Sequence, residues 1–531
     1  MAIATLKFAS RSNLYILRPT PFQCIRKVVP KSLALVDAEA WDKKIPAWKK
    51  LSSKELGLRR SMIAGPTMKV LNMLKDKEYD VYLVGGCVRD LILKQIPKDF
   101  DIITSADLKE VLRTFPRCEI VGKKFPICHV HMGGTIVEVS SFNTATRKSN
   151  HFHHDIEAPS GCDKEDYLRW RNCLKRDFTI NGLMFDPYAR IVYDYMGGME
   201  DIEKAKVCMY LFVVIVSYYY FLPPLAINLV RTVVPAASSF QEDCARILRA
   251  IRIAARLGFS ISSETAHSVK NLSSSVLRLD KGRLLMEMNY MLAYGSGEAS
   301  LRLLWKFGLL DILLPFQAAY FVRHGFRRRD KRTNMLLSLF YNLDKLLAPN
   351  RPCHSSLWIG ILAFHKTLSD QPREASVVAA FSLAVHNGGN LLEAVDIARR
   401  INKQHNARFP ELLDPSGLDA EDLEEEILDL ADSVKGTLSQ MTTRYLVSQA
   451  MADYPQAPHS DLVFIPLGMY LKALSIFDCV KVNSGKKFLS KQGRKIDYGS
   501  LVQGELEEIR HVFARIVFDT IYPLRLDKEN S

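Results

Sequence analysis

Two aspartates two positions apart are the residues of this 531-residue chain whose types and spacing most clearly suggest chemistry. Asp99 and Asp101 flank Phe100, and residues i and i+2 of a β-strand point to the same face, so a strand here would present both carboxylates together. Two such carboxylates repel each other unless a divalent cation lies between them. Phosphoryl transfer uses that arrangement; a solvated acidic turn is the alternative for an isolated pair.

A glycine pair and an arginine precede these aspartates in the run GGCVRD. Gly85 and Gly86 have no side chains, so backbone N–H groups at the start of a predicted helix can approach a phosphate closely. Arg89 adds a planar cationic fork suited to a triphosphate. Glu138, on a predicted strand, is a candidate third carboxylate. The combination predicts a phosphoryl-transfer site that uses Mg²⁺, with Mn²⁺ as an alternative.

Two later motifs carry groups suited to a nucleotide. Arg176 and Asp177, in KRDFTING, offer a donor and an acceptor to a ribose or phosphate. Asp243 and Arg246, three apart on a predicted helix, could read the Watson–Crick edge of a base without a nucleic-acid template. A salt bridge on a solvated helix is the alternative. Further arginines continue nearly the same stripe and are candidates for phosphate contacts: Arg249, Arg252 and Arg256.

The surrounding pattern predicts an α+β fold, with a head of mixed β-sheet and helices followed by an all-helical neck and body. Helices are expected at Met68–Leu74, Val88–Leu93 and 107–115, and strands at Val81–Val84, Phe100–Ile103, 127–131 and 135–142. After Gln241 the pattern is helical. The predicted divisions are a leader and flexible N-terminus (1–55), a head (66–207), an apolar insert (208–230), a neck that reads the base and binds RNA (231–315) and a body (316–531).

Charge and composition narrow the partners and the compartment. The net charge of +14 favours an anionic partner, either nucleic acid or an anionic membrane surface. The ten cysteines show no metal-binding spacing and are typical of thiols in a reducing compartment. No acidic residue precedes Asp37, whereas lysines and arginines are frequent there. This bias predicts a transit peptide for a chloroplast or mitochondrion, with a disordered basic tail as the alternative.

The ordered motifs GGCVRD, DFDI, KRDFTING, DYMGGMEDI and EDCARILRAIRIAARLGF resemble those of the class II tRNA CCA-adding enzymes and bacterial-type poly(A) polymerases. The resemblance extends from about Val81 to Pro315, with Lys175 where the family usually has arginine. It implies metal binding by Asp99 and Asp101, triphosphate binding by Gly86 and Arg89, sugar contacts by Arg176 and Asp177, base reading by Asp243 and Arg246, and nucleotide or RNA contacts by Arg249 and Arg252.

The resemblance implies template-independent addition of nucleotides to the 3′ end of an mRNA or tRNA, from ATP and, as an alternative, also CTP, with no DNA partner. The stretches VGKKFPICHVHMGGTIVEVSSF and FGLLDILLP resemble the poly(A) polymerase branch more closely. CCA addition to tRNA stays open, because both activities would use the same pair, Asp243 and Arg246.

Residues 208–230 contain no charged side chain and are long enough to span a bilayer, although Pro223-Pro224 interrupts them. Their deletion leaves KAKVRTVV, which fits the family pattern. Our hypothesis is that the segment is a retained intron or a gene-model artefact. A membrane anchor and a family-specific loop are the alternatives, and a membrane is a partner only if the segment is translated and inserted. A catalytically inactive RNA-binding or membrane-associated protein, disabled by this insert, is the competing functional class.

Overall fold

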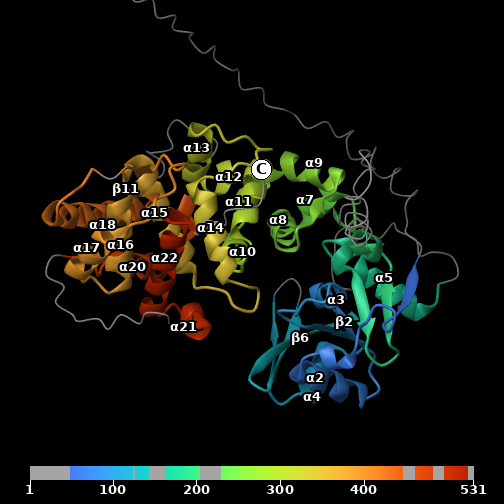
Figure 1. Cartoon of the computed structure of the whole chain (residues 1–531). Helices are drawn as coiled ribbons and strands as arrows, with labels where there is room; N and C mark the ends of the chain where they lie inside the picture. The colour runs from blue at the N-terminus through green and yellow to red at the C-terminus, as the bar shows by residue number, and fades with distance from the viewer. Residues whose placement is uncertain are drawn as a thin grey trace, which may run out of the picture. The chain divides into compact units, whose positions relative to one another are not determined.

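The computed structural model describes residues 48–122, 126–142, 162–203, 229–414, 416–445, 461–481 and 495–523. An eight-stranded sheet with its helices comes first in the chain, and helices make up most of the remaining described residues (Figure 1). The predicted α+β fold is therefore confirmed. The predicted transit peptide, up to residue 47, and residues 208–228 of the predicted insert lie outside the described residues.

The head is built on a mixed sheet with the strand order β1-β8-β7-β2-β3-β6-β5-β4. Neighbouring strands run antiparallel except β3 and β6, which are parallel. The strands are β1 (Lys49–Ser52), β2 (Val81–Val84), β3 (Asp101–Thr104), β4 (Cys118–Val121), β5 (Ile127–Met132), β6 (Thr135–Ser141), β7 (Leu183–Asp186) and β8 (Ile191–Asp194). All four residues of the central strand β2 are buried, in keeping with their uninterrupted apolar run.

Helices α2 (Gly65–Lys75) and α4 (Leu108–Thr114) pack against the sheet (Figure 1). The apolar side chains of α2 recur at helical spacing, which buries Val70, Leu71 and Leu74. Asp107 and Glu110 form a capping box that fixes the start of α4. The remaining head helices are α3 (Gly86–Ile92) and α5 (Lys164–Cys173). The helices and strands predicted between Met68 and residue 142 are all present, with ends shifted by a few residues.

Helix α8 (Ala245–Leu257) belongs to both hydrophobic cores of the described chain. Its Ile247, Leu248 and Ile251 join the core of the helical part, whereas Ala250 and Ile253 join the core of the head. Apolar residues on two sides of α8 leave one stripe for the arginines, and Gly258 ends the helix at a φ of 68°. The sequence of α8 therefore makes it an element through which the head and the helical part share buried surface.

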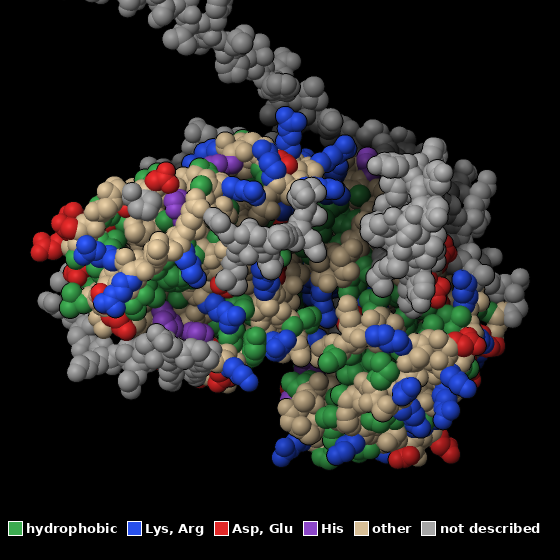
Figure 2. Space-filling view, viewed as in Figure 1, with side chains coloured by type: hydrophobic (Ala, Val, Ile, Leu, Met, Phe, Trp, Pro, Cys, Tyr) green, Lys and Arg blue, Asp and Glu red, His purple; other side chains and the backbone are tan. Residues whose placement is uncertain are grey.

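Among the described residues the other α-helices are α7 (Ala236–Glu242), α9 (Ser263–Asn271), α10 (Lys281–Leu292), α11 (Gly297–Lys306), α12 (Leu310–Leu313), α13 (Pro315–Arg323), α14 (Met335–Leu346), α15 (Ser355–Asp370), α16 (Ala375–His386), α17 (Leu391–Arg399), α18 (Ala420–Thr442), α20 (Leu467–Phe477), α21 (Tyr498–Gln503) and α22 (Leu506–Ile521). Acidic side chains gather at the end of this array where α17 and α18 lie, whereas lysines and arginines are spread widely (Figure 2). No described helix is both long and apolar enough to cross a membrane.

Two predicted boundaries differ from the structure. Strand β1 pairs with β8, so the sheet begins at Lys49, inside the stretch 1–55 that we expect to be a flexible leader. Leu229 and Val230, the last residues of the predicted insert, form β9 (Leu229–Val230), which pairs with β10 (Ser260–Ile261), and Val230 is buried in the head core. Both segments are too short to show strand periodicity, so only their pairing partners reveal them.

Candidate active site

Asp101 is the first residue of β3, and Asp99 lies in the bend that precedes it. Asp101 is half-buried, whereas 69% of the Asp99 side chain is exposed and its Oδ2 lies 3.5 Å from Lys98 Nζ. The prediction that both aspartates occupy one face of a strand is therefore wrong, because the strand starts too late to include Asp99. The two carboxylates still interact electrostatically, since Asp99 raises the pKa of Asp101.

Glu138 is the register partner of Asp101 across the parallel β3–β6 pair. Residues paired in this way place their side chains on the same face of a sheet. Half of the Glu138 side chain is exposed, and its Oε1 lies 3.8 Å from His129 Nε2 on β5. The structure thus brings Glu138, the candidate third carboxylate, directly beside Asp101.

The surroundings of Asp101 suit a cation. Burial raises its pKa to about 6; the charge of Arg176 opposes this rise, and the charges of Glu138 and Asp99 add to it. Among the described residues, no group of three or more His, Cys, Asp or Glu side chains could hold a metal by itself. Mg²⁺ in phosphoryl-transfer sites is often held by one or two carboxylates together with substrate phosphates. The carboxylates around Asp101 fit that donor set.

Gly85 lies where Asp101 and Arg176 converge. Its φ is 81°, and a Cβ at this position would lie 3.1 Å from Arg176 Nη1 and 3.3 Å from Asp101 Oδ2. The backbone therefore favours glycine here for its conformation and for the space it leaves. The Gly85 N–H donates to the Leu183 carbonyl at 3.3 Å, so in this structure it is not directed at a phosphate. A Cβ on Gly86 would meet Arg89 Nη2 at 3.4 Å.

Arg89, expected to hold the triphosphate, is 5% exposed. Its Nε and Nη2 donate to Asp90 Oδ1 at 2.8 and 2.6 Å, and its Nη1 donates to Asn181 Oδ1 at 2.6 Å. Arg256 Nη2 lies 3.3 Å from the other oxygen of Asp90. In this arrangement Arg89 fixes the position of α3 against the KRDFTING segment, and its role toward a triphosphate stays a prediction.

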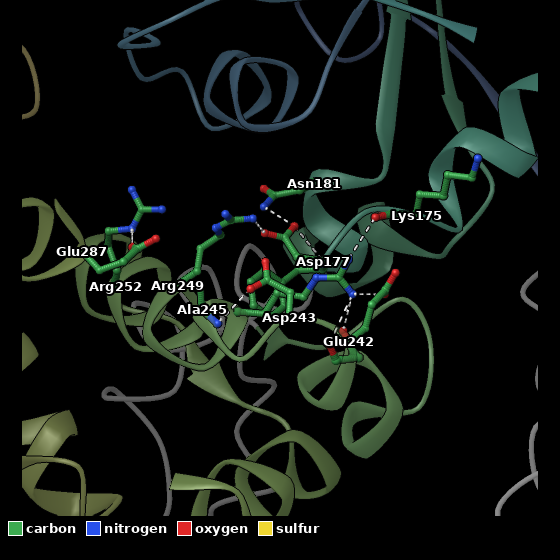
Figure 3. A network of polar contacts seen from close by, with 12 residues as sticks. Lys175, Asp177, Asn181, Glu242, Asp243, Ala245, Arg249, Arg252 and Glu287 are labelled. Atoms are coloured by element: carbon green, nitrogen blue, oxygen red, sulfur yellow. Dashed lines mark hydrogen bonds and ion pairs between the residues drawn. The ribbon is translucent and has the colours of Figure 1, made fainter. Parts of the chain in front are cut away.

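Asp177 is the centre of a polar network that joins the head to α8 (Figure 3). Its Oδ2 accepts from Arg249 Nη1 at 2.9 Å, and its Oδ1 accepts from Asn181 Nδ2 at 3.0 Å and from the Phe178 N–H at 2.8 Å. Burial alone would raise the pKa of Asp177, but the charge of Arg249 and these three hydrogen bonds hold it at about 2. Asp177 is therefore ionised, and it positions Arg249 at the edge of the site.

Asp243 and Arg246 are close in the chain but do not share a helix. Asp243 ends α7 with extended backbone, and its Oδ1 accepts from the Ala245 N–H at 3.0 Å. Arg246 donates to Ser239 Oγ at 2.9 Å and to Glu242 Oε2 at 3.0 Å (Figure 3 shows Asp243 and Glu242). The prediction that both residues lie on one helix is wrong, because α7 and α8 are separated at Asp243, although the Arg246 N–H still donates to the Asp243 carbonyl at 3.1 Å. Base reading by the pair stays a prediction.

Each arginine of the α8 stripe has a carboxylate partner, and three of the partners are distant in sequence. Arg252 Nε lies 3.3 Å from Glu287 Oε2 (Figure 3). The pairs are Arg246–Glu242, Arg249–Asp177, Arg252–Glu287 and Arg256–Asp90. Sequence analysis did not identify Glu287 as a functional residue. The signal that could have found it is a carboxylate on the apolar face of α10.

Two protein families match the parts of the chain that build this site. Residues 81–208 match the family described as "Poly A polymerase head domain", and residues 258–321 match "Probable RNA and SrmB- binding site of polymerase A". The first match contains Asp99, Asp101, Glu138 and Arg176, and α8 lies between the two matches.

Curated relatives match longer stretches of the chain than either family model does. Poly(A) polymerase I of Salmonella typhimurium is 31% identical over 283 residues, which are 50% of this chain and 54% of that protein. The CCA-adding enzyme of Geobacillus kaustophilus is 32% identical over 244 residues, 46% of this chain and 53% of that protein. The chain thus spans about half the length of these relatives.

Among solved structures, that of the Bacillus stearothermophilus CCA-adding enzyme in complex with CTP is 21% identical, covers 79% of this chain and 93% of that chain, and has a TM-score of 0.40. Through residues 81–208 and 258–321 the chain matches two domains of the poly(A) polymerase type, and over about half its length it is homologous to bacterial poly(A) polymerase I and the CCA-adding enzymes.

Proposed function

We propose that this protein is a template-independent nucleotidyltransferase that adds AMP to RNA 3′ ends, with ATP and an RNA end as its substrates. The observation that carries the proposal is the convergence of Asp101 and Arg176 at Gly85, with Glu138 paired to Asp101 on the neighbouring strand, inside the segment that matches the poly(A) polymerase head domain. Poly(A) polymerases I and CCA-adding enzymes match the chain at similar identity, so CCA addition is the second candidate.

In this proposal Asp101 and Asp99 bind Mg²⁺ and Glu138 lies beside them. Mg²⁺ held by these residues would supply positive charge that offsets the negative charge developing during transfer. Arg176 lies near enough to Asp101 to contact the same phosphates. The Asp177–Arg249 pair holds α8 beside the head, so the nucleotide and the metal site keep a fixed distance.

Location in a chloroplast or mitochondrion is part of the same proposal. It is supported by the stretch before Asp37, which is rich in lysine and arginine and contains no acidic residue. A fusion of residues 1–55 to a fluorescent protein tests it: import into either organelle supports the proposal, and diffuse fluorescence in the cytosol contradicts it.

The experiment that separates the candidate activities supplies ATP alone, CTP alone or both, with Mg²⁺, to a tRNA that lacks its CCA end and to an unstructured RNA. Long A tails on either RNA support poly(A) addition. Addition that needs CTP and stops after CCA on the tRNA supports the second candidate. RNA binding without any incorporation supports the inactive alternative.

A further inference from the structure

Tyr290 of α10 and Tyr294 just after it form an aromatic pair beside the candidate metal site. Their ring centroids lie 5.1 Å apart, and both side chains are half-buried. Lys98 Nζ lies 4.5 Å from the Tyr290 centroid and 5.1 Å from the Tyr294 centroid. The same Nζ donates to Tyr290 Oη at 3.3 Å and lies 3.5 Å from Asp99 Oδ2, so one lysine side chain separates the aromatic pair from Asp99.

A buried carboxylate, Glu287, holds an arginine against the Tyr290 ring. Glu287 is 0% exposed, and its two oxygens lie 3.3 Å from Arg252 Nε and 3.2 Å from Arg283 Nη2. The Arg252 guanidinium lies 4.8 Å from the Tyr290 centroid (Figure 3 shows Arg252 against Glu287). Arg252 is therefore anchored on the ring, whereas Lys98 reaches the same ring from an exposed bend on a flexible stem.

We propose that Tyr290 and Tyr294 are the stacking platform for the last base of the RNA acceptor, and that Lys98 and Arg252 contact the adjoining phosphates. The proposal rests on the proposed function, because it names the binding site for the RNA end in that reaction. Aromatic rings interleaved with cations are the surface on which single-stranded RNA binds without sequence preference. When RNA binds, Lys98 moves from the Tyr290 ring to a phosphate, and the base then stacks on the ring.

The distance along α8 favours the RNA end over the incoming nucleotide. Arg246, predicted to read the incoming base, is six residues before Arg252, about 9 Å along the helix. One planar base does not reach both positions, but neighbouring nucleotides do. Lys98 also links the platform to Asp99, the aspartate at which the RNA 3′ hydroxyl arrives in the proposed function.

The test compares the full chain with Tyr290→Leu, Tyr290→Phe and Tyr294→Ala. Tyr290→Leu keeps apolar volume but removes the aromatic face. Its KM for RNA is expected to rise about 10-fold or more, with the KM for ATP within about twofold of the wild-type value. Tyr290→Phe keeps the ring and should stay close to wild type. The matched control is Tyr341→Ala on α14, where Lys345 Nζ also lies over an exposed tyrosine ring, at 4.3 Å.

Anisotropy of a fluorescein-labelled oligo(A) RNA, measured without ATP, makes the result independent of catalysis. Weaker binding by Tyr290→Leu with an unchanged thermal unfolding midpoint supports the platform. An increase in the KM for ATP alone assigns the rings to the incoming nucleotide and overturns the proposal, as does unchanged RNA binding. If the wild-type protein incorporates no nucleotide, the proposed function fails, whereas the anisotropy still decides for or against the platform.

Discussion

Arg249 Nη1 on α8 lies 2.9 Å from Asp177 Oδ2 in the head, and this ion pair joins the predicted sugar-binding segment to the predicted base-reading helix. The two residues are 72 positions apart in the chain, and the Asp177 side chain is 7% exposed. The pair therefore contributes to the stability of the folded chain and to the alignment of the site. These two contributions can be measured separately.

Replacement of Arg249 by alanine leaves the buried Asp177 carboxylate without its counter-charge. We expect a loss of about 3 kcal/mol in the free energy of unfolding, at the low end for a broken buried pair because 28% of the Arg249 side chain is exposed. Urea denaturation measures it. The double variant with Asp177→Asn should recover part of the loss, because it removes the unpaired charge. Arg400→Ala, which breaks the exposed pair with Asp396, is the control and should change little. Equal losses in both variants would contradict the account.

The same pair predicts a pH dependence with a defined sign. The folded chain holds the pKa of Asp177 at about 2, below the ordinary 3.8, so its contribution to stability is present above about pH 4 and is lost as the pH falls through 2. The difference in unfolding free energy between wild type and Asp177→Asn should shrink as the pH is lowered from 4 to 2. A difference that stays constant over this range would show that the Asp177 charge is not involved.

Gly85 offers a test of site geometry. Gly85→Ala places a Cβ between Arg176 and Asp101 and should lower kcat about 100-fold, as a small displacement at a reacting centre does. Gly134→Ala is the matched control, because Gly134 has a similar φ of 78° and nothing within 4 Å of its would-be Cβ. The two variants place an alanine at a similar positive φ, so equal kcat losses would contradict a special role for Gly85.

Deletion of residues 208–230 tests the hypothesis of a retained intron. The deletion removes Val230, which is buried in the head core, but it joins Val207 to Arg231 and so restores a valine at that place in the sequence. We expect transfer activity equal to or above that of the full chain, and transcripts that lack the segment. Loss of activity on deletion, together with its presence in every transcript, would show that the segment belongs to the enzyme.

Local patterns predicted the local structure, and long-range pairing decided the rest. The apolar run at Val81–Val84 and the spacing within Gly65–Lys75 were enough to predict β2 and α2. The strand prediction is wrong at Asp99 because the start of β3 depends on pairing with β2. That pairing begins at Asp101. The adjacency of Glu138 to Asp101 follows from the parallel β3–β6 register, which no local periodicity encodes.

The site shows the same division. Motif order was enough to place Asp101 and Arg176 in one predicted site, and both lie beside Gly85, but it did not show that Arg89, Arg249 and Arg252 are bound to carboxylates. The partners Asp177 and Glu287 lie in other segments, and only the fold brings them to α8. Asp243 was placed on a helix because helical spacing continues through it, whereas the backbone there is extended.

The most direct test of the account is incorporation of radiolabelled AMP into an unstructured RNA by the Asp101→Asn variant, with Mg²⁺ and no template. Asparagine keeps the shape of the side chain but removes the charge that a cation needs, so incorporation should fall by about 1000-fold or more. Asp80→Asn, a half-exposed carboxylate on the head, should retain wild-type activity. The predicted result is that the wild-type protein and Asp80→Asn incorporate AMP and that Asp101→Asn does not. Near-normal incorporation by Asp101→Asn would contradict the account.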